Sequence, residues 1–289
     1  AHRGFTLEAL LHFYAQLENR MPWFDPTRST TADVVRAAII PASRAGAHED
    51  MQDLDVALAV AMMGGATTLP DRMVTHNWSN LFCDLVAAVI ADALEIRSYE
   101  KIALQMRSGM PKLMEDLADR HLLGISYWIC AFSVNQHKGI CSSASTCDSV
   151  TGLQHGTCEC STPKLFEGVS CEMDKFDHMM GYITQQNPEF RQVVAVDAEF
   201  QLFRRAWCVA ELVKASDLGI QQKMKLHSDQ KLNLHYKKLE NVKVQKCLAS
   251  RPEDKVLILS KIPSYTAFNK ELRQLILGNM QSWIDATEQ

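Results

Sequence analysis

Polar side chains follow three short apolar runs of this 289-residue sequence, at the points where buried strands would end. In an open parallel sheet, ligands bind beyond the carboxyl ends of the strands, where such side chains converge. We therefore expect one rim of a sheet to form a binding pocket. Its candidate residues are His76, Asn77 and Trp78 after residues 73–75, Asn135 after residues 125–134, and Asp197 after residues 192–196.

Each of these residues also has a plain structural explanation. Asn77 or Ser79 would cap the helix that follows, and Asp197 would cap the helix that begins near Glu199; we favour capping in both cases. Histidines such as His76 usually bond to nearby backbone groups, and Trp78 would be a packing anchor. Only the convergence of all these groups indicates a pocket.

A second group with chemical potential is a cysteine-rich stretch. Zinc would suit it in a reducing compartment and disulfides in an oxidising one, but the stretch has no Cys-x-x-Cys pair. We therefore favour a loop with free or partly paired thiols and do not favour zinc, although both zinc and disulfides remain open. The stretch contains five of the nine cysteines, Cys141, Cys147, Cys158, Cys160 and Cys171, and is flanked by His137, His155 and His178.

The elements that would position these groups alternate between short apolar runs and longer amphipathic ones, which predicts an α/β fold with a parallel sheet flanked by helices. We predict strands at 73–75, 125–134, 192–196 and 223–227. The clearest helix runs from Leu81 to Leu94, with apolar residues at three- and four-residue intervals. Residues 1–70 are predicted to be an N-terminal helical extension, and 71–289 an α/β domain with a cysteine-rich insertion at about 137–172.

Composition excludes several classes of function. The net charge is -4 and the isoelectric point is about 6.2, so no general attraction to nucleic acid is expected. No run approaches the roughly 20 apolar residues that a membrane span requires. The first residues lack the features of a secretory signal. We expect an intracellular, cytoplasmic protein, with a removed leader left open because the chain begins at Ala1.

The segment from Phe203 to Leu212 contains Trp207 and Cys208 followed by Glu211. It resembles the Trp-Cys-x-x-Glu-Leu motif that TIR domains carry in the helix after their third strand. The segment from Met73 to Leu85 is similar to the first strand and helix of that family. Order and spacing agree from Arg72 to about Leu277.

The resemblance implies a flavodoxin-like fold, self-association or assembly with other proteins, and in many members cleavage of NAD at the nicotinamide–ribose bond. In those enzymes the motif glutamate is catalytic, a role that would carry over to Glu211, with Trp207 packed one turn away. NAD would be a substrate, and no cofactor is implied. Bond breaking develops positive charge on the ribose, which a fixed carboxylate stabilises.

Two other functions remain open. Many TIR domains are scaffolds without catalysis, so the main alternative is a non-catalytic assembly module or a subunit of a larger complex. In that case Glu211 would be only an acid on the helix surface. The lesser alternative is a metal- or redox-responsive protein that acts through the cysteine-rich stretch.

Overall fold

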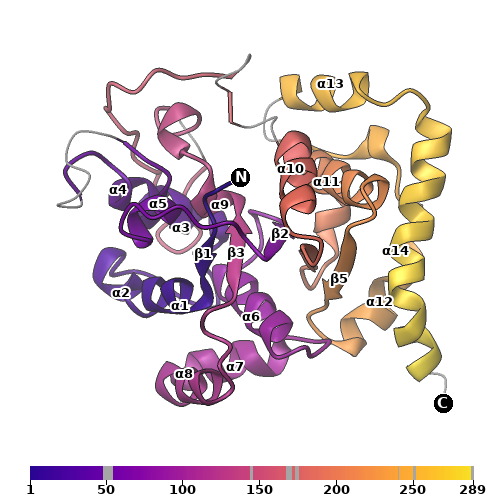
Figure 1. The fold of residues 1–289 in the computed structure, drawn as a ribbon, viewed down its shortest axis with the longest axis horizontal. Helices are drawn as coiled ribbons and strands as arrows, with labels where there is room; N and C mark the ends of the chain where they lie inside the picture. Colours follow the sequence, from indigo (N-terminus) through magenta and orange to yellow (C-terminus); the bar gives the residue numbers. More distant parts are fainter. Residues whose placement is uncertain are drawn as a thin grey trace.

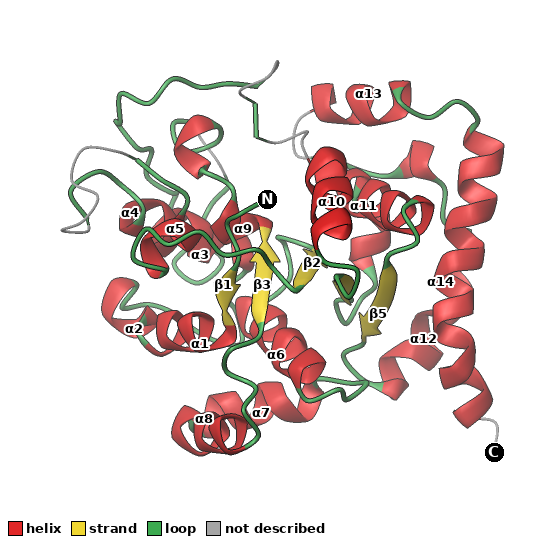
Figure 2. Ribbon diagram, in the orientation of Figure 1, coloured by secondary structure: helices red, strands yellow, loops and turns green. Residues whose placement is uncertain are grey.

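The computed structural model describes residues 1–47, 55–143, 146–166, 171–172, 176–239, 241–249 and 252–287. Its centre is a five-stranded mixed sheet in the order β1-β3-β2-β4-β5 (Figures 1 and 2). Strands β2 to β5 run parallel, and β1 is antiparallel to β3. The strands are β1 (Phe5–Thr6), β2 (Arg72–His76), β3 (Ser126–Ile129), β4 (Arg191–Ala195) and β5 (Gln221–Lys225).

The predicted parallel strands are confirmed, but the second is shorter than expected. Its apolar run was predicted as a strand over 125–134, whereas β3 ends at Ile129 and the chain turns into α9 (Cys130–Ser133). The Ser133 hydroxyl accepts a hydrogen bond from the Ile129 amide at the turn. A short buried helix and a buried strand both appear as a continuous apolar run, so periodicity could not separate them.

Helices cover both faces of the sheet. Both faces need cover because successive side chains of a strand point to opposite faces. Val193 and Ala195 of β4 face a core that includes α6 (Phe82–Ala93), whereas Val194 between them faces the core that includes α11 (Ala206–Asp217). Beside α6 lie α7 (Glu100–Ser108) and α8 (Met110–Asp119). The α11 side also carries α10 (Phe176–Gln186), α12 (Asp229–Leu239), α13 (Pro252–Ser260) and α14 (Tyr265–Thr287).

The N-terminal stretch is largely helical, as predicted, but Phe5 and Thr6 form a strand. The Phe5 ring lies 5.1 Å from that of Phe132, which also contacts Phe13 of α1 and Phe82 of α6. These rings place residues from before and after position 70 of the sequence in one hydrophobic core. The elements are α1 (Leu7–Ala15), α2 (Leu17–Arg20), α3 (Thr31–Val34), a π-helix (Val35–Ile39), α4 (Ile40–Ala42) and α5 (Leu58–Met62).

A buried ion pair fastens α6 to the sheet. Asp92, which is only 1% exposed, pairs with Arg72 of β2 and accepts a hydrogen bond from the Tyr127 hydroxyl of β3 at 3.2 Å. Lys225 of β5 lies 3.9 Å from the same carboxylate. The carboxylate therefore balances cations that burial would otherwise make costly.

Gly219, just after the end of α11, has a positive φ of 67°, a conformation that suits glycine at the end of a helix. Within the described ranges, no helix combines the length and apolar character needed to span a membrane.

Candidate functional site

A pocket of about 620 Å³ opens at the carboxyl ends of the parallel strands. His76 and Trp78 line it from the end of β2, and residues 133–140 line it beyond β3. Trp207 and Glu211 of α11 form the opposite side. The pocket also contacts the N-terminus, which lies near α9 and α10 in Figure 1. The direction of the strand order reverses between β2 and β4, where open parallel sheets usually bind their ligands.

Glu211 is held in place by a side chain from the sheet. The Thr75 hydroxyl of β2 donates to Glu211 Oε2 at 2.6 Å. Since Thr75 is fully buried at the middle of the sheet, this contact fixes the carboxylate from below. Glu211 also lines the pocket. The arrangement presents one acid of defined orientation to a ligand.

The contact continues as a chain of polar side chains under the pocket. Gln192 Nε2 of β4 donates to Thr75 Oγ1 at 2.7 Å, and Gln222 Nε2 of β5 donates to Gln192 Oε1, also at 2.7 Å. Gln222 also donates to the carbonyl of Leu212 at 2.9 Å, which brings the chain back to α11. Such a connected buried network resists rearrangement because each member satisfies the next. It makes the position of Glu211 rigid.

Burial raises the pKa of Glu211 from 4.5 to about 7, and the hydrogen bond from Thr75 opposes this shift only in part. The side chain is half-buried, because the pocket leaves it some access to water. A carboxyl group that titrates near neutrality inside a pocket is typical of functional sites. Glu211 can therefore exist as either acid or carboxylate at physiological pH.

Two tryptophans give the pocket flat apolar surfaces. Trp207 Nε1 donates to Asp254 Oδ2 at 3.3 Å, and its ring meets Phe176 of α10 edge to face at 5.7 Å. Trp78 Nε1 lies 3.3 Å from Cys130 Sγ. With their polar edges occupied, the rings are held in one orientation, which suits stacking against a planar ligand.

Three titratable groups near Glu211, His76, Cys130 and Cys208, are neutral at pH 7. Burial lowers the pKa of His76 to about 4 despite its contact with the Val74 carbonyl. Burial, with a contribution from Glu211, raises the pKa of Cys130 to about 12, and the same causes raise the pKa of Cys208. Because a thiolate is the reactive form of cysteine, neither sulfur is activated as a nucleophile. Glu211 is the group of this set whose charge changes near neutrality.

Charged groups also line the pocket. Glu172 accepts from Arg3 Nη1 at 2.5 Å and lies 3.3 Å from Lys138 Nζ. The amide of Asn135 also donates to Glu172, at 2.9 Å. Burial acts to raise the pKa of Glu172, but the hydrogen bond and charge of Arg3 lower it overall. Arg205, which precedes α11, adds another cation to the lining.

The pocket brings together five of the seven residues that the sequence singled out: His76, Trp78, Asn135, Trp207 and Glu211. Asn77 and Asp197 are buried but are not part of its lining. Asp197 accepts from three backbone amides, at Glu199, Gln201 and Leu202, in the turn that leads into a 3-10 helix (Gln201–Arg204). The helix expected near Glu199 begins only at Ala206 and has no side-chain cap, so the predicted capping of that helix by Asp197 is wrong. Asn77 instead bonds to the Ser79 amide within a turn, and α6 begins without a side-chain cap.

Comparison with known proteins provides no related protein in which this pocket could be compared. No family model matches the sequence, and no similar curated protein or solved structure was found. The resemblance to TIR domains therefore depends on the motif at Trp207, Cys208 and Glu211 and on the order of the strands.

Sequence reasoning missed the polar chain beneath Glu211. Thr75 was treated only as part of a strand, and Gln192 and Gln222 were not considered. A signal was present, because a glutamine in a strand that is otherwise mostly apolar requires a buried partner. The partner itself could not be named without the pairing of β2 with β4 and β5.

Among the residues that the structure describes, two groups of side chains have donors close enough to surround a metal ion. One consists of His137, Cys141, Cys158 and Cys160. The other consists of Asp33, Asp148 and His155, whose oxygens and nitrogen already bond within the protein. His155 lies 3.0 Å from Asp33, and Asp148 accepts from the amides of residues 150 and 151. The second group fastens the insertion to α3 without any need for an ion.

Proposed function

We propose that this protein is a TIR-like enzyme that hydrolyses NAD⁺ at the nicotinamide–ribose bond, with Glu211 as its catalytic carboxylate. The observation that carries the proposal is the position of Glu211. The side chain is held by Thr75 at 2.6 Å and lines a pocket of about 620 Å³ beside Trp78 and Trp207. A volume of this size suits a dinucleotide or a large part of one.

The order of the parallel strands supports the TIR-like part of the proposal. Numbered from β2, the four parallel strands have the order 2-1-3-4 across the sheet, which is the beginning of the flavodoxin-like order. Helix α11, which carries the motif, follows the third of these strands, as the resemblance requires. The antiparallel strand β1 is an addition at the edge next to the second.

In the proposed reaction the bond between the ribose C1′ and the nicotinamide nitrogen breaks, and its electron pair leaves with nicotinamide. The ribose then carries positive charge, which the Glu211 carboxylate stabilises. Water adds to C1′ and releases one proton. The products are nicotinamide and ADP-ribose, and charge and atoms balance without any other reactant.

The other pocket residues are suited to bind the rest of the dinucleotide. Trp78 and Trp207 offer ring faces for the planar nicotinamide or adenine. Lys138 and Arg205 place cations at the wall, where the diphosphate needs a counter-charge. His76 is neutral and buried, so it adds no repulsion against the cationic nicotinamide ring.

The raised pKa of Glu211 gives the proposal a pH signature. Only the carboxylate stabilises a ribosyl cation, and the pKa of Glu211 is about 7. NAD⁺ cleavage should therefore increase as the pH rises through about 7 and reach a plateau above it. A group with an ordinary glutamate pKa would give activity that is constant over this range.

The deciding experiment measures nicotinamide release from NAD⁺ by the purified chain, for wild type and Glu211→Gln. Glutamine keeps the size and the bond to Thr75 but cannot carry the charge. We expect a loss of about a hundredfold or more, the usual cost of removing one such electrostatic contact. Glu199→Gln is the matched control, because Glu199 is an exposed glutamate outside the pocket lining.

The outcomes separate the enzyme from the scaffold. The assay should include concentrated protein, because the resemblance implies self-association. If wild type releases no nicotinamide even then, the enzyme proposal fails and the non-catalytic assembly module takes its place. Equal rates in wild type and Glu211→Gln would leave an NAD-cleaving protein but remove Glu211 from its mechanism.

A further inference from the structure

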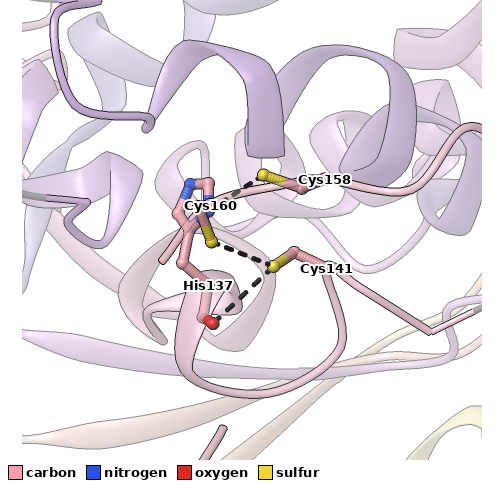
Figure 3. A group of neighbouring side chains, drawn as sticks. All are labelled: His137, Cys141, Cys158 and Cys160. Carbon is pink, nitrogen blue, oxygen red and sulfur yellow. Dashed lines mark hydrogen bonds between the residues drawn. The ribbon is translucent and has the colours of Figure 1, made fainter. Parts of the chain in front are cut away.

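We propose that His137, Cys141, Cys158 and Cys160 form a structural zinc site that fastens the cysteine-rich insertion beside the pocket. The sequence leaves zinc open but does not favour it, because no two cysteines have the usual Cys-x-x-Cys spacing. The fold brings the four side chains together from two segments of the insertion, residues 137–141 and 158–160 (Figure 3). This inference does not depend on NAD cleavage.

The distances among the donor atoms match a tetrahedral zinc centre. One donor atom from each of the four residues lies within 4.8 Å of the other three. Cys141 Sγ is 3.6 Å from Cys160 Sγ, and Cys158 Sγ is 3.7 Å from His137 Nδ1. Bonds of about 2.3 Å to sulfur and about 2.0 Å to nitrogen place such ligands roughly 3.5 to 3.8 Å apart. The site is therefore already near the required size.

The histidine is oriented as a zinc ligand. His137 Nε2 lies 3.2 Å from the Ser43 hydroxyl, which itself donates to the Ile39 carbonyl at 2.8 Å. The serine oxygen therefore accepts a hydrogen bond from the Nε2–H group, which leaves Nδ1 as the acceptor on the side of the cysteines. Zinc-bound histidines are usually fixed by a partner on the second ring nitrogen in this way.

A lysine supplies the charge that such a site lacks. Zinc with three thiolates and a neutral imidazole has a net charge of about −1. Lys164 Nζ lies 3.3 Å from Cys160 Sγ and is held there by the carbonyls of His137 and Thr162, at 2.7 and 2.9 Å. Its ammonium group would neutralise the centre. The lysine also connects the two segments that carry the ligands.

The location indicates a structural role. Three cysteines and one histidine complete a four-coordinate centre, which leaves no position for a substrate. Cys141 is buried, and Cys158 and Cys160 pack against the core that contains the N-terminal helices. His137 lies within the stretch 133–140 that lines the pocket. Zinc would thus hold the pocket wall against α4 and the residues that follow it.

The test begins with the metal content of wild-type protein and two serine variants, measured by atomic emission after growth with added zinc. We expect about one zinc per chain in wild type and loss of most of it in Cys160→Ser. Cys147→Ser is the matched control, because Cys147 lies in the same insertion, is exposed and is not part of the group. It should keep its zinc.

Ser43→Ala tests the orientation of His137 without removing a ligand. Loss of such a supporting hydrogen bond typically weakens metal binding about 10- to 100-fold.

Cobalt(II) in place of zinc gives a measurement that needs no variant. Wild type should show the visible bands of tetrahedral cobalt and the absorption of cobalt–thiolate bonds.

Two results with metal-free protein would overturn the proposal. One is wild-type protein without metal whose Cys141, Cys158 and Cys160 all react with an alkylating agent, which would mean free thiols. The other is protein without metal in which Cys141 and Cys160 react only after reduction, which would mean a disulfide. Retention of zinc by Cys160→Ser with the same cobalt spectrum as wild type would also exclude the assigned ligands.

Discussion

Replacing Glu211 with glutamine should stabilise the protein at alkaline pH while it removes the proposed NAD⁺ cleavage. Burial raises the pKa of Glu211 from 4.5 to about 7 in the folded chain. The folded state therefore holds this proton more tightly than the unfolded state. Relative to a neutral side chain, Glu211 does not lower the free energy of unfolding below about pH 4.5. Its ionisation lowers that free energy increasingly as the pH rises, and the effect is complete above about pH 7.

The size of the effect follows from the shift in pKa. Each pKa unit corresponds to about 1.4 kcal/mol, so a rise from 4.5 to about 7 gives an upper limit of about 3.5 kcal/mol. Because the side chain has some access to water through the pocket, we expect about 1 to 3 kcal/mol. Glutamine also keeps the acceptor for the Thr75 hydroxyl, so no buried donor loses its partner.

The assay is urea unfolding of wild type and Glu211→Gln at pH 8.5 and at pH 4.5. The variant should have the larger free energy of unfolding at pH 8.5, and the difference should shrink strongly at pH 4.5. Glu199→Gln should show no such gain, because the hydrogen bond from Lys231 lowers the pKa of Glu199 instead. A variant that is less stable than wild type at pH 8.5 would refute the claim that ionised Glu211 destabilises the folded protein.

Three further predictions concern the surroundings of the site. Thr75→Val removes the bond that holds down the pKa of Glu211, so the pH profile of NAD⁺ cleavage should move to higher pH; an unchanged profile would contradict the assigned contact. Asp92→Asn leaves buried cations without their counter-charge and should cost about 3 to 5 kcal/mol in the free energy of unfolding, measured in urea at pH 7. Burial raises the pKa of Cys130 to about 12, so its thiol should react slowly at pH 8. Mass spectrometry should find iodoacetamide on the exposed Cys147 well before Cys130, and the reverse order would show an activated thiol beside Glu211.

Most of the α/β pattern could be predicted from local sequence. The strands at 73–75 and 192–196 are short apolar runs, and helix α6 repeats its apolar residues every three or four positions. Both signals come from neighbours in the chain, and the structure confirms these elements. Gly219 ends α11 for an equally local reason, because its positive φ suits glycine.

Elements whose state depends on distant partners could not be predicted in this way. Phe5–Thr6 is a strand because it pairs with Tyr127 and Ser126, far along the chain. Cys130–Ser133 is a helix although its residues continue an apolar run that also suits a strand. In both cases tertiary contacts outweigh local preference.

The same division holds for the candidate sites. The sequence alone indicated Glu211, through its place in the motif, and indicated that His76 and Trp78 follow a strand. Only the tertiary structure decided that Thr75 holds the carboxylate, because that contact requires α11 to lie against β2. Only the folded insertion brings His137 to Cys158 and Cys160, since residues about twenty positions apart in a loop meet only when the surrounding core fixes the path of the chain.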